Sequence, residues 1–201
     1  MKVVLLDYGA GNVTSVQRAL QRLGVESEQA ISREGIAQAE ALVLPGVGHY
    51  AALIRALEER GLRAPLLDAL QRRVPFLGIC LGLQALYETS EEAPELSGLK
   101  LLAGGVQALP ATVKLPHMGW NQLQTKRDSR LLAGVGDNAY FYFAHSYAAL
   151  DGNGEAAATC THGAAFVAVI ERENMCGVQF HPEKSGDAGQ RVLKNFLRIA
   201  A

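Results

Sequence analysis

The stretch Phe76-Leu77-Gly78-Ile79-Cys80-Leu81-Gly82 decides the fold of this chain. It begins as a continuous apolar run, typical of a strand buried on both faces of a sheet, and an apolar helical pattern follows it. Cys80 lies at the junction, with a glycine two residues away on either side. A strand that turns sharply into a helix in this way indicates an α/β fold with parallel strands.

The same alternation of strand and helix precedes this stretch. Buried strands are predicted at residues 2–6 and 41–44, and residues 25–29 are a further candidate strand. Asn12 is predicted to be the N-cap of the first of three helices, whose apolar residues recur at helical spacing over 13–23, 50–57 and 62–70.

Beyond about Leu101 the pattern changes to short strand-like runs separated by polar turns. These runs are at residues 140–143, 156–160, 165–170 and 175–180, and a last helix has its apolar stripe at 192–197. We therefore predict an α/β fold. A mostly parallel central sheet has helices on both faces, and antiparallel strands are added to it from the C-terminal half.

Length and composition favour a single domain over residues 1–201. The chain is 49% hydrophobic, which is enough for one sizeable core. The 19 basic and 20 acidic residues nearly cancel, which argues against an electrostatic grip on nucleic acid or on a membrane. The apolar run near the N-terminus is too short for a signal peptide or a membrane span, so we expect a cytoplasmic protein.

The cysteines and histidines do not predict a metal site. Cys80, Cys160 and Cys176 share no metal-type spacing, and we expect reduced thiols. The histidines share no ligand spacing either. Gly9-Ala10-Gly11 is similar to a dinucleotide-binding loop, but it lacks a third glycine and an acidic partner, so we expect no nucleotide there.

A candidate base lies in Gly177-Val178-Gln179-Phe180-His181-Pro182-Glu183. Extended backbone directs side chains i and i+2 to the same face, so His181 and Glu183 are predicted to touch. Pro182 supports an extended conformation because it fixes its own φ and keeps the preceding residue out of the helical region. A carboxylate beside a histidine orients the ring and stabilises its protonated form.

Cys80 is the candidate nucleophile for this base. The flanking glycines permit a strained turn, and the N-terminus of the following helix favours a thiolate over a thiol. A buried structural cysteine is the alternative interpretation. The position between two glycines at a strand end favours catalysis.

Backbone amides near Cys80 are candidates for an oxyanion hole. The run Leu44-Pro45-Gly46-Val47-Gly48 ends a neighbouring strand, where open α/β sheets bind ligands. The amides of Val47 and Gly48, with that of Leu81 just after the nucleophile, are predicted to stabilise a developing oxyanion. A plain turn is the alternative, because Pro-Gly often follows a strand.

Two polar residues follow the nucleophile at helical spacing. Gln84 and Glu88 lie four and eight residues beyond Cys80, so a continuous helix would place all three near one face. They are candidates for a substrate pocket, and a solvated helix face is the alternative. His145 ends another predicted strand, from which it could reach the same pocket.

These motifs resemble those of a known family. The order Cys80, His181 and Glu183 resembles the triad of class I glutamine amidotransferases, and the match covers the whole chain. More narrowly, several blocks look like the glutaminase subunit of imidazole glycerol phosphate synthase. These blocks are 7–12 (DYGAGN), 44–50 (LPGVGHY), 78–84 (GICLGLQ), 117–121 (HMGWN), 145–147 (HSY) and 180–185 (FHPEKS).

The resemblance implies a reaction and a partner. Cys80 attacks the side-chain amide of glutamine, His181 protonates the leaving ammonia, and Glu183 holds the imidazole. A γ-glutamyl thioester forms, and water then releases glutamate. In the family, ammonia passes to a (β/α)8-barrel cyclase subunit, which makes imidazole glycerol phosphate and an aminoimidazole-carboxamide ribotide in histidine biosynthesis. We therefore expect an enzyme that works in a heterodimer and needs no cofactor.

The resemblance also assigns residues to two regions. Around the glutamine it places Gly48, Gln84, Glu88, Ser146 and Tyr147. At the contact with the cyclase it places Asn12, Trp120, Tyr142 and Lys184.

Three alternatives stand beside this hypothesis. A glutaminase of another synthase would have the same triad, but the DYGAGN and HMGWN blocks argue against it. A stand-alone cysteine hydrolase would share the elbow, whereas a glutaminase of this type should be weak alone and active with its cyclase. An inactive binding module is disfavoured because Cys80, His181 and Glu183 are all present.

Overall fold

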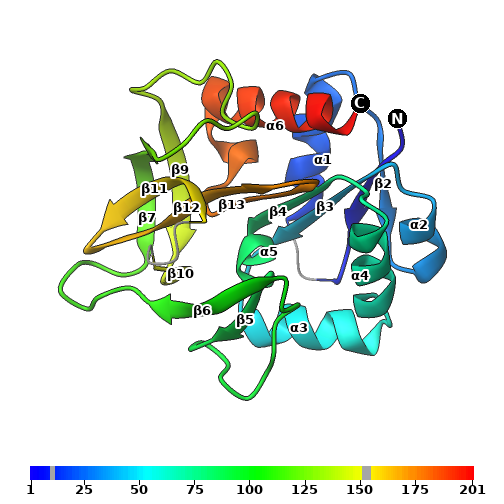
Figure 1. Ribbon diagram of the computed structural model, residues 1–201, viewed down its shortest axis with the longest axis horizontal. Coiled ribbons are helices and arrows are strands. Elements are labelled where there is room, and N and C mark those ends of the chain that lie inside the picture. Colours follow the sequence, from blue (N-terminus) through cyan, green and yellow to red (C-terminus); the bar gives the residue numbers. More distant parts are fainter. Residues whose placement is uncertain (10–11, 151–154) are drawn as a thin grey trace.

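A central eight-stranded sheet organises the described part of the chain, residues 1–9, 12–150 and 155–201 (Figure 1). In this computed structural model the strand order is β2-β1-β3-β4-β13-β12-β11-β8. The parallel half contains β2 (Ser27–Ala30), β1 (Val3–Leu6), β3 (Ala41–Gly46), β4 (Phe76–Cys80) and β13 (Met175–Val178). The antiparallel additions are β12 (Ala164–Arg172), β11 (Ala156–His162) and β8 (Gln124–Thr125). The predicted mostly parallel sheet with antiparallel additions is confirmed.

Helices cover both faces of this sheet, as predicted (Figure 1). One face carries α1 (Val13–Arg22) and α6 (Gly186–Ala200). The other carries α2 (Arg33–Ala37), α3 (Tyr50–Glu59) and α4 (Arg63–Gln71). Side chains alternate between the faces of a strand, so Val3 and Leu5 pack beneath α1 and α6, whereas Val4 and Leu6 pack beneath α3.

Two smaller sheets lie beside the central one. The first contains β10 (Tyr147–Ala149), β6 (Leu102–Ala108) and β5 (Tyr87–Ser90). The second pairs β7 (His117–Gln122) with β9 (Tyr140–His145). The prediction that residues 140–143 join the central sheet is therefore wrong, because they pair with β7 and no local pattern reveals that choice of partner. Residues 175–180 also differ from the prediction, since β13 runs parallel to β4 and antiparallel only to β12.

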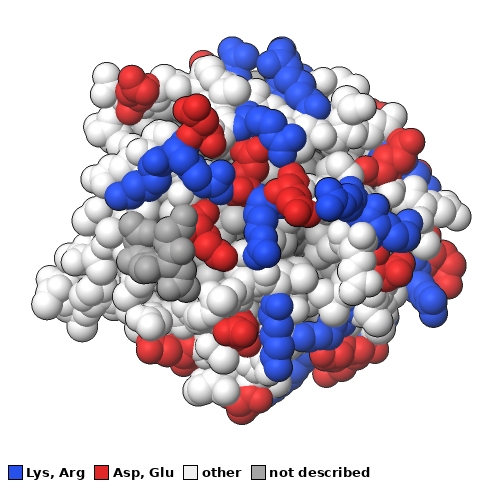
Figure 2. All heavy atoms as spheres, in the orientation of Figure 1, with Lys and Arg blue, Asp and Glu red and all other residues white. Residues whose placement is uncertain are grey.

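The surface has no strong bias in charge on the face shown in Figure 2, where acidic and basic side chains are interspersed. None of the helices in the described ranges has the length and apolar character of a membrane span.

Strand ends from distant parts of the chain meet at one edge of the sheet. Gly46 of β3 is aligned with Cys80 of β4. On the other side of β4, Val178 of β13 is aligned with Ile79. The residues that follow Val178 therefore begin beside Cys80, and this edge holds the candidate site.

Candidate active site

Cys80 occupies the strained turn that the sequence predicts. Its φ of 53° and ψ of −105° lie where residues with a side chain are rarely found. The flanking glycines make this turn possible, because a Cβ on Gly82 would lie 2.0 Å from the carbonyl oxygen of Leu44, and one on Gly78 would lie 2.5 Å from that of Gly82. The elbow is thus pressed against β3 with no room for side chains at either glycine.

The helix after Cys80 is shorter than predicted. It is the single turn α5 (Leu81–Gln84), and the chain then enters β5. Glu88 is therefore not on a helix face with Cys80. It is exposed on β5, where its carboxylate accepts a hydrogen bond from the backbone amide of Gly104 at 2.9 Å.

His181 and Glu183 touch, as predicted. His181 Nδ1 lies 2.9 Å from Glu183 Oε1, and both side chains are buried. The prediction of extended backbone from His181 to Glu183 is wrong, however, because η1 (Pro182–Lys184) is a 3₁₀ helix that begins right after His181. Proline suits the first position of a helix, and a single turn still returns Glu183 to the ring.

The imidazole of His181 lies between two acidic partners. Burial opposes its positive charge most strongly, but hydrogen bonds to Cys80 and Glu183 and the charges of both outweigh burial and raise the pKa of His181 to about 10. Because Nδ1 is taken by Glu183, Nε2 is the nitrogen left for the sulfur. This line of groups can hold a thiolate–imidazolium pair.

Asn12 supports this line. It is not the helix N-cap that the sequence predicts, because its side chain makes no capping hydrogen bond to α1. Its Nδ2 instead donates to Glu183 Oε1 at 3.3 Å, across 171 residues of sequence. Ala10 and Gly11 of the same motif lie outside the described residues.

A cavity of about 160 Å³ opens beside Cys80 and His181. Most of the predicted site residues line it, namely Val47, Gly48, Leu81, Gln84, Ser146, Tyr147 and Lys184. His145 also lines it, as its place at a strand end suggested. Glu88 does not, and Glu92 supplies the carboxylate there instead. Glu92 accepts from the backbone amide of Tyr50 at 2.8 Å, at the start of α3.

The predicted oxyanion amides are not all free. The N–H of Val47 donates to the hydroxyl of Tyr8 at 3.2 Å, and that hydroxyl lies 3.3 Å from the carbonyl oxygen of Val47, to which it donates. Burial raises the pKa of Tyr8 to about 12, so the phenol keeps its proton. Tyr8 therefore holds both peptide groups that flank the Cα of Val47. Gly48 has a φ of 94°, which favours glycine at that position.

An aromatic surface leads from the cavity to solvent. The ammonium of Lys184 lies 5.8 Å from the ring centre of Tyr142, and this ring meets Trp120 edge-on at 5.9 Å. Trp120 is 55% exposed, and Met118 and Tyr140 on the same pair of strands are 65% and 53% exposed. We call Met118, Trp120, Tyr140 and Tyr142 the aromatic surface.

The whole chain matches one family model. The model is "Glutamine amidotransferase class-I", and it matches residues 4–200. The chain belongs to this family. Its curated relatives include proteins called "Imidazole glycerol phosphate synthase subunit HisH". The one from Moorella thermoacetica is 46% identical over 96% of this chain and 93% of the relative, and the one from Methanothermobacter thermautotrophicus is 45% identical over 98% of each.

Solved structures agree with the fold of this amidotransferase. A structure described as a glutamine amidotransferase superposes with a TM-score of 0.78, at 21% identity and over 98% of both chains. PurLQS from Thermotoga maritima superposes with a TM-score of 0.75, at 18% identity and over 98% of this chain and 97% of that one. At these identities, the likeness supports the fold alone.

Three residues of the amidotransferase site were missed by reasoning from the sequence. Tyr8 and Glu92 reach the site through tertiary contacts that leave no local pattern. Gln179 lies 3.5 Å from Cys80 Sγ, and a signal for it exists. It precedes His181 by two residues in extended backbone, and therefore shares its face.

Only one of the three cysteines of the amidotransferase is expected to react in the native protein. Burial raises the pKa of the Cys160 and Cys176 thiols to about 12, so both stay protonated and shielded. Iodoacetamide at about pH 8 should modify Cys80 alone, as intact mass and peptide mapping would show. All three should react in denaturant. Rapid native labelling of Cys160 or Cys176 would contradict this prediction.

Proposed function

We propose that this amidotransferase hydrolyses glutamine with Cys80 as nucleophile, His181 as acid and base, and Glu183 as the group that orients His181. The observation that carries the proposal is the buried, hydrogen-bonded line from Cys80 to Glu183 at the wall of a cavity. The thiolate attacks the amide carbon, and His181 gives its proton to the departing ammonia. His181 then takes a proton from water, which attacks the thioester, and glutamate leaves as the thiolate re-forms.

The cavity offers complementary groups for the amino-acid end of glutamine. The Nε2 of Gln84 already donates to the carbonyl of Tyr147 at 2.7 Å and to Gln179 Oε1 at 3.1 Å, so only its carbonyl oxygen remains for a ligand. Glu92 adds a carboxylate that suits the substrate ammonium. Gly48, Ser146 and Tyr147 complete the wall. In this proposal Glu92 takes the place that the resemblance implied for Glu88.

The oxyanion hole is proposed to use the amides of Leu81, Gly48 and Val47. The Val47 amide must first leave the hydroxyl of Tyr8. The resting geometry is thus proposed to be a low-activity one, in which the glycines around Val47 permit a peptide rotation when a partner signals. Structures with and without ligand in the partner subunit would test this idea, and an unchanged orientation of residues 46–48 would contradict it.

The partner is proposed to be the cyclase subunit of imidazole glycerol phosphate synthase, a (β/α)8 barrel that receives the ammonia in histidine biosynthesis. The HisH relatives are named as subunits of that synthase. The aromatic surface supports a docking role because exposed aromatic side chains next to a cavity are typical of interface centres. Lys184, Trp120 and Tyr142 would lie at this contact, and Asn12 would link it to Glu183. We still expect the chain to form a single domain and the protein to be cytoplasmic.

The decisive experiment is a glutaminase assay with and without the cyclase and its nucleotide substrate. Weak activity alone and a steep rise in the complex are expected. Full activity of the isolated chain would favour a stand-alone cysteine hydrolase. Activation by a different synthase subunit, and not by the cyclase, would favour a glutaminase of another pathway.

Trp120→Ala is expected to weaken the complex. Truncation of a central aromatic side chain typically raises Kd by about tenfold or more, and titration calorimetry with the cyclase would measure it. Ile31→Ala is the matched control, because Ile31 is 60% exposed between β2 and α2, away from the aromatic surface (Figure 1). Equal Kd values for both variants would remove Trp120 from the interface.

Glu183→Gln is expected to lower kcat for glutamine by about a hundredfold or more, because the neutral amide no longer stabilises the imidazolium of His181. The complex should still assemble, as size-exclusion chromatography would show. Glu88→Gln serves as control, since Glu88 lies on β5 outside the cavity. Turnover by Glu183→Gln at the rate of the control would remove Glu183 from the mechanism.

A further inference from the structure

Gln179 is a fully buried polar residue beside the nucleophile. It follows β13, whose last residue Val178 is aligned with Ile79, so Gln179 and Cys80 continue adjacent strands. Its backbone amide donates to the carbonyl of Ala168 at 2.9 Å, which fixes the main chain. Its side-chain Nε2 lies 3.5 Å from Cys80 Sγ.

We propose that Gln179 is a catalytic residue that donates a hydrogen bond to the sulfur of Cys80 and so stabilises the thiolate. This proposal rests on the proposed function only in taking Cys80 as the nucleophile. His181 also interacts with Cys80, but in the proposed reaction His181 gives its proton to ammonia. Gln179 cannot lose one, and it therefore remains a donor when the sulfur is expelled from the thioester.

The orientation of the Gln179 amide follows from its neighbours. A backbone carbonyl can only accept, so the nitrogen of Gln84 must face the carbonyl of Tyr147 at 2.7 Å. The second hydrogen on that nitrogen points to Gln179 Oε1 at 3.1 Å. The opposite end of the Gln179 amide, which faces the sulfur, is consequently the NH2 group. If the Gln179 amide were flipped, two donors would face each other at Gln84, and two acceptors would face each other at a Cys80 thiolate.

The carbonyl of Tyr147 is itself held by a directed chain of hydrogen bonds. Asn121 Nδ2 donates to the carbonyl of Thr161 at 3.1 Å and lies 3.3 Å from His117 Nε2. His117 Nδ1 lies 3.1 Å from His145 Nε2, and His145 Nδ1 lies 3.0 Å from the carbonyl of Tyr147. The carbonyls of Thr161 and Tyr147, at the two ends, can only accept hydrogen bonds. Both therefore require the donors to point from Asn121 towards Tyr147. Each ring carries its proton on Nδ1 and accepts on Nε2.

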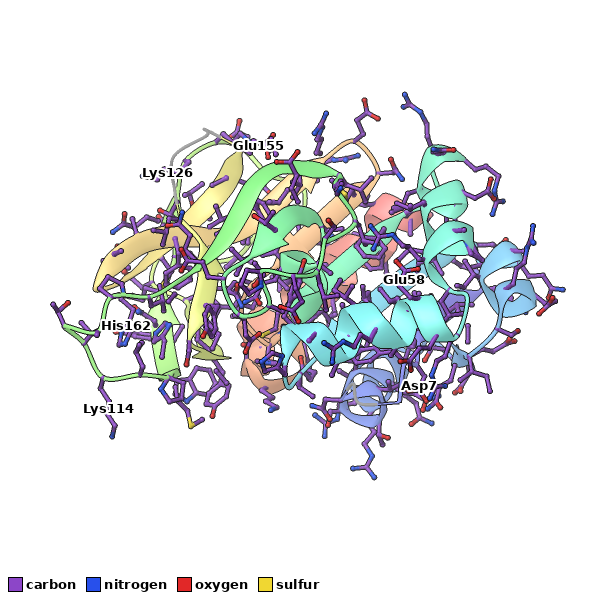
Figure 3. All side chains as sticks on the ribbon, turned by 90° about the horizontal axis from the view of Figure 1, so that it is seen from below. Asp7, Glu58, Lys114, Lys126, Glu155 and His162 are labelled. Atoms are coloured by element: carbon purple, nitrogen blue, oxygen red, sulfur yellow. The ribbon has the colours of Figure 1, made fainter. Side chains whose placement is uncertain are left out.

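The two histidines in this series of hydrogen bonds, His117 and His145, stay neutral. Burial first, and then neighbouring histidines, lower the pKa of His117 to about 4 and that of His145 to about 3. The titratable groups near them are His162, which stacks on His117 at 4.2 Å, and His181 near His145. His162 also bonds the carbonyl of Lys114 at 2.8 Å, and both lie at the end of the molecule away from Asp7 and Glu58 (Figure 3). The direction of the chain is thus kept while His181 is charged.

The dependence of Cys80 alkylation on pH tests the proposal without using glutamine. The wild-type protein and Gln179→Leu would be treated with iodoacetamide, and the rate of Cys80 modification followed by peptide mass. A lost hydrogen bond to a charged sulfur should slow Gln179→Leu about tenfold at about pH 6. At about pH 10, where the thiolate needs no such support, the two rates should agree within about twofold.

Two further variants guard against a folding defect. Gln179→Asn keeps a buried amide that is too short to reach the sulfur, and it should show the same slow rate at low pH. Thr159→Val replaces another fully buried polar side chain, whose hydroxyl has no hydrogen-bond partner among the described residues, and it should react like wild type. Wild-type rates in Gln179→Leu and Gln179→Asn at low pH would overturn the proposal. Equal slowing at both pH values would also overturn it, because that result means restricted access. Because alkylation of Cys80 requires no glutamine, this test gives a result even if the protein has no glutaminase activity.

Discussion

Cys80→Ala is expected to abolish glutamine-dependent synthesis by the complex while synthesis from added ammonium salts continues. Without the sulfur no thioester can form, and removal of a covalent nucleophile typically lowers turnover by at least about a thousandfold. Free ammonia needs no glutaminase, so the partner can still use it. The two activities are measured on the same assembled complex, with glutamine or with an ammonium salt as nitrogen source.

A matched control for this variant is Cys160→Ala. Cys160 is fully buried in β11, and no step of the mechanism uses it. The folded Cys160→Ala variant should keep both activities. If Cys80→Ala lost both activities equally, Cys80 would be structural and the proposed mechanism would fail.

Gly82→Ala is expected to destabilise the fold severely. The added Cβ would lie 2.0 Å from the carbonyl oxygen of Leu44 and 3.3 Å from its side chain, and backbone of a central strand cannot move aside. Overpacking of this kind costs about 3 kcal/mol or more, a large part of the stability of a single domain. Urea unfolding followed by circular dichroism would measure the loss.

The control for this substitution is Gly136→Ala, because no atom of the described residues lies within 4 Å of a Cβ built there and its backbone is not in the left-handed region. Its urea midpoint should match wild type. A wild-type midpoint for Gly82→Ala as well would mean that the elbow moves away from β3 easily.

The fold and the main contact of the site were predictable where they depend on local pattern. The apolar run before Cys80 predicts the central strand, and the paired glycines predict the strained turn. The contact of His181 with Glu183 was predictable because the two are neighbours in sequence, although the turn between them is helical and not extended. These features arise from short-range sterics and alternation.

The other features depend on long-range contacts. The leucine-rich pattern after Cys80 continues beyond Gln84, but α5 ends there because the chain is drawn into a sheet with β6, and Glu88 leaves the site with it. Tyr8 meets Val47 only because β1 and β3 are neighbours. Asn12 bonds a carboxylate in preference to its own helix. Residue spacing carries no information about such choices between partners.

The position of β13 has a consequence for the folding of the nascent chain. This strand is the last of the central sheet in chain order, yet it lies between β4 and β12, so the sheet is split until residue 178 has been synthesised. His181 and Glu183 come later still. In the proposed mechanism, Cys80 therefore lacks its base until roughly a hundred further residues have been synthesised, and the formation of contacts of such long range is slow. An incomplete chain that lacks His181 and Glu183 is therefore expected not to hydrolyse glutamine.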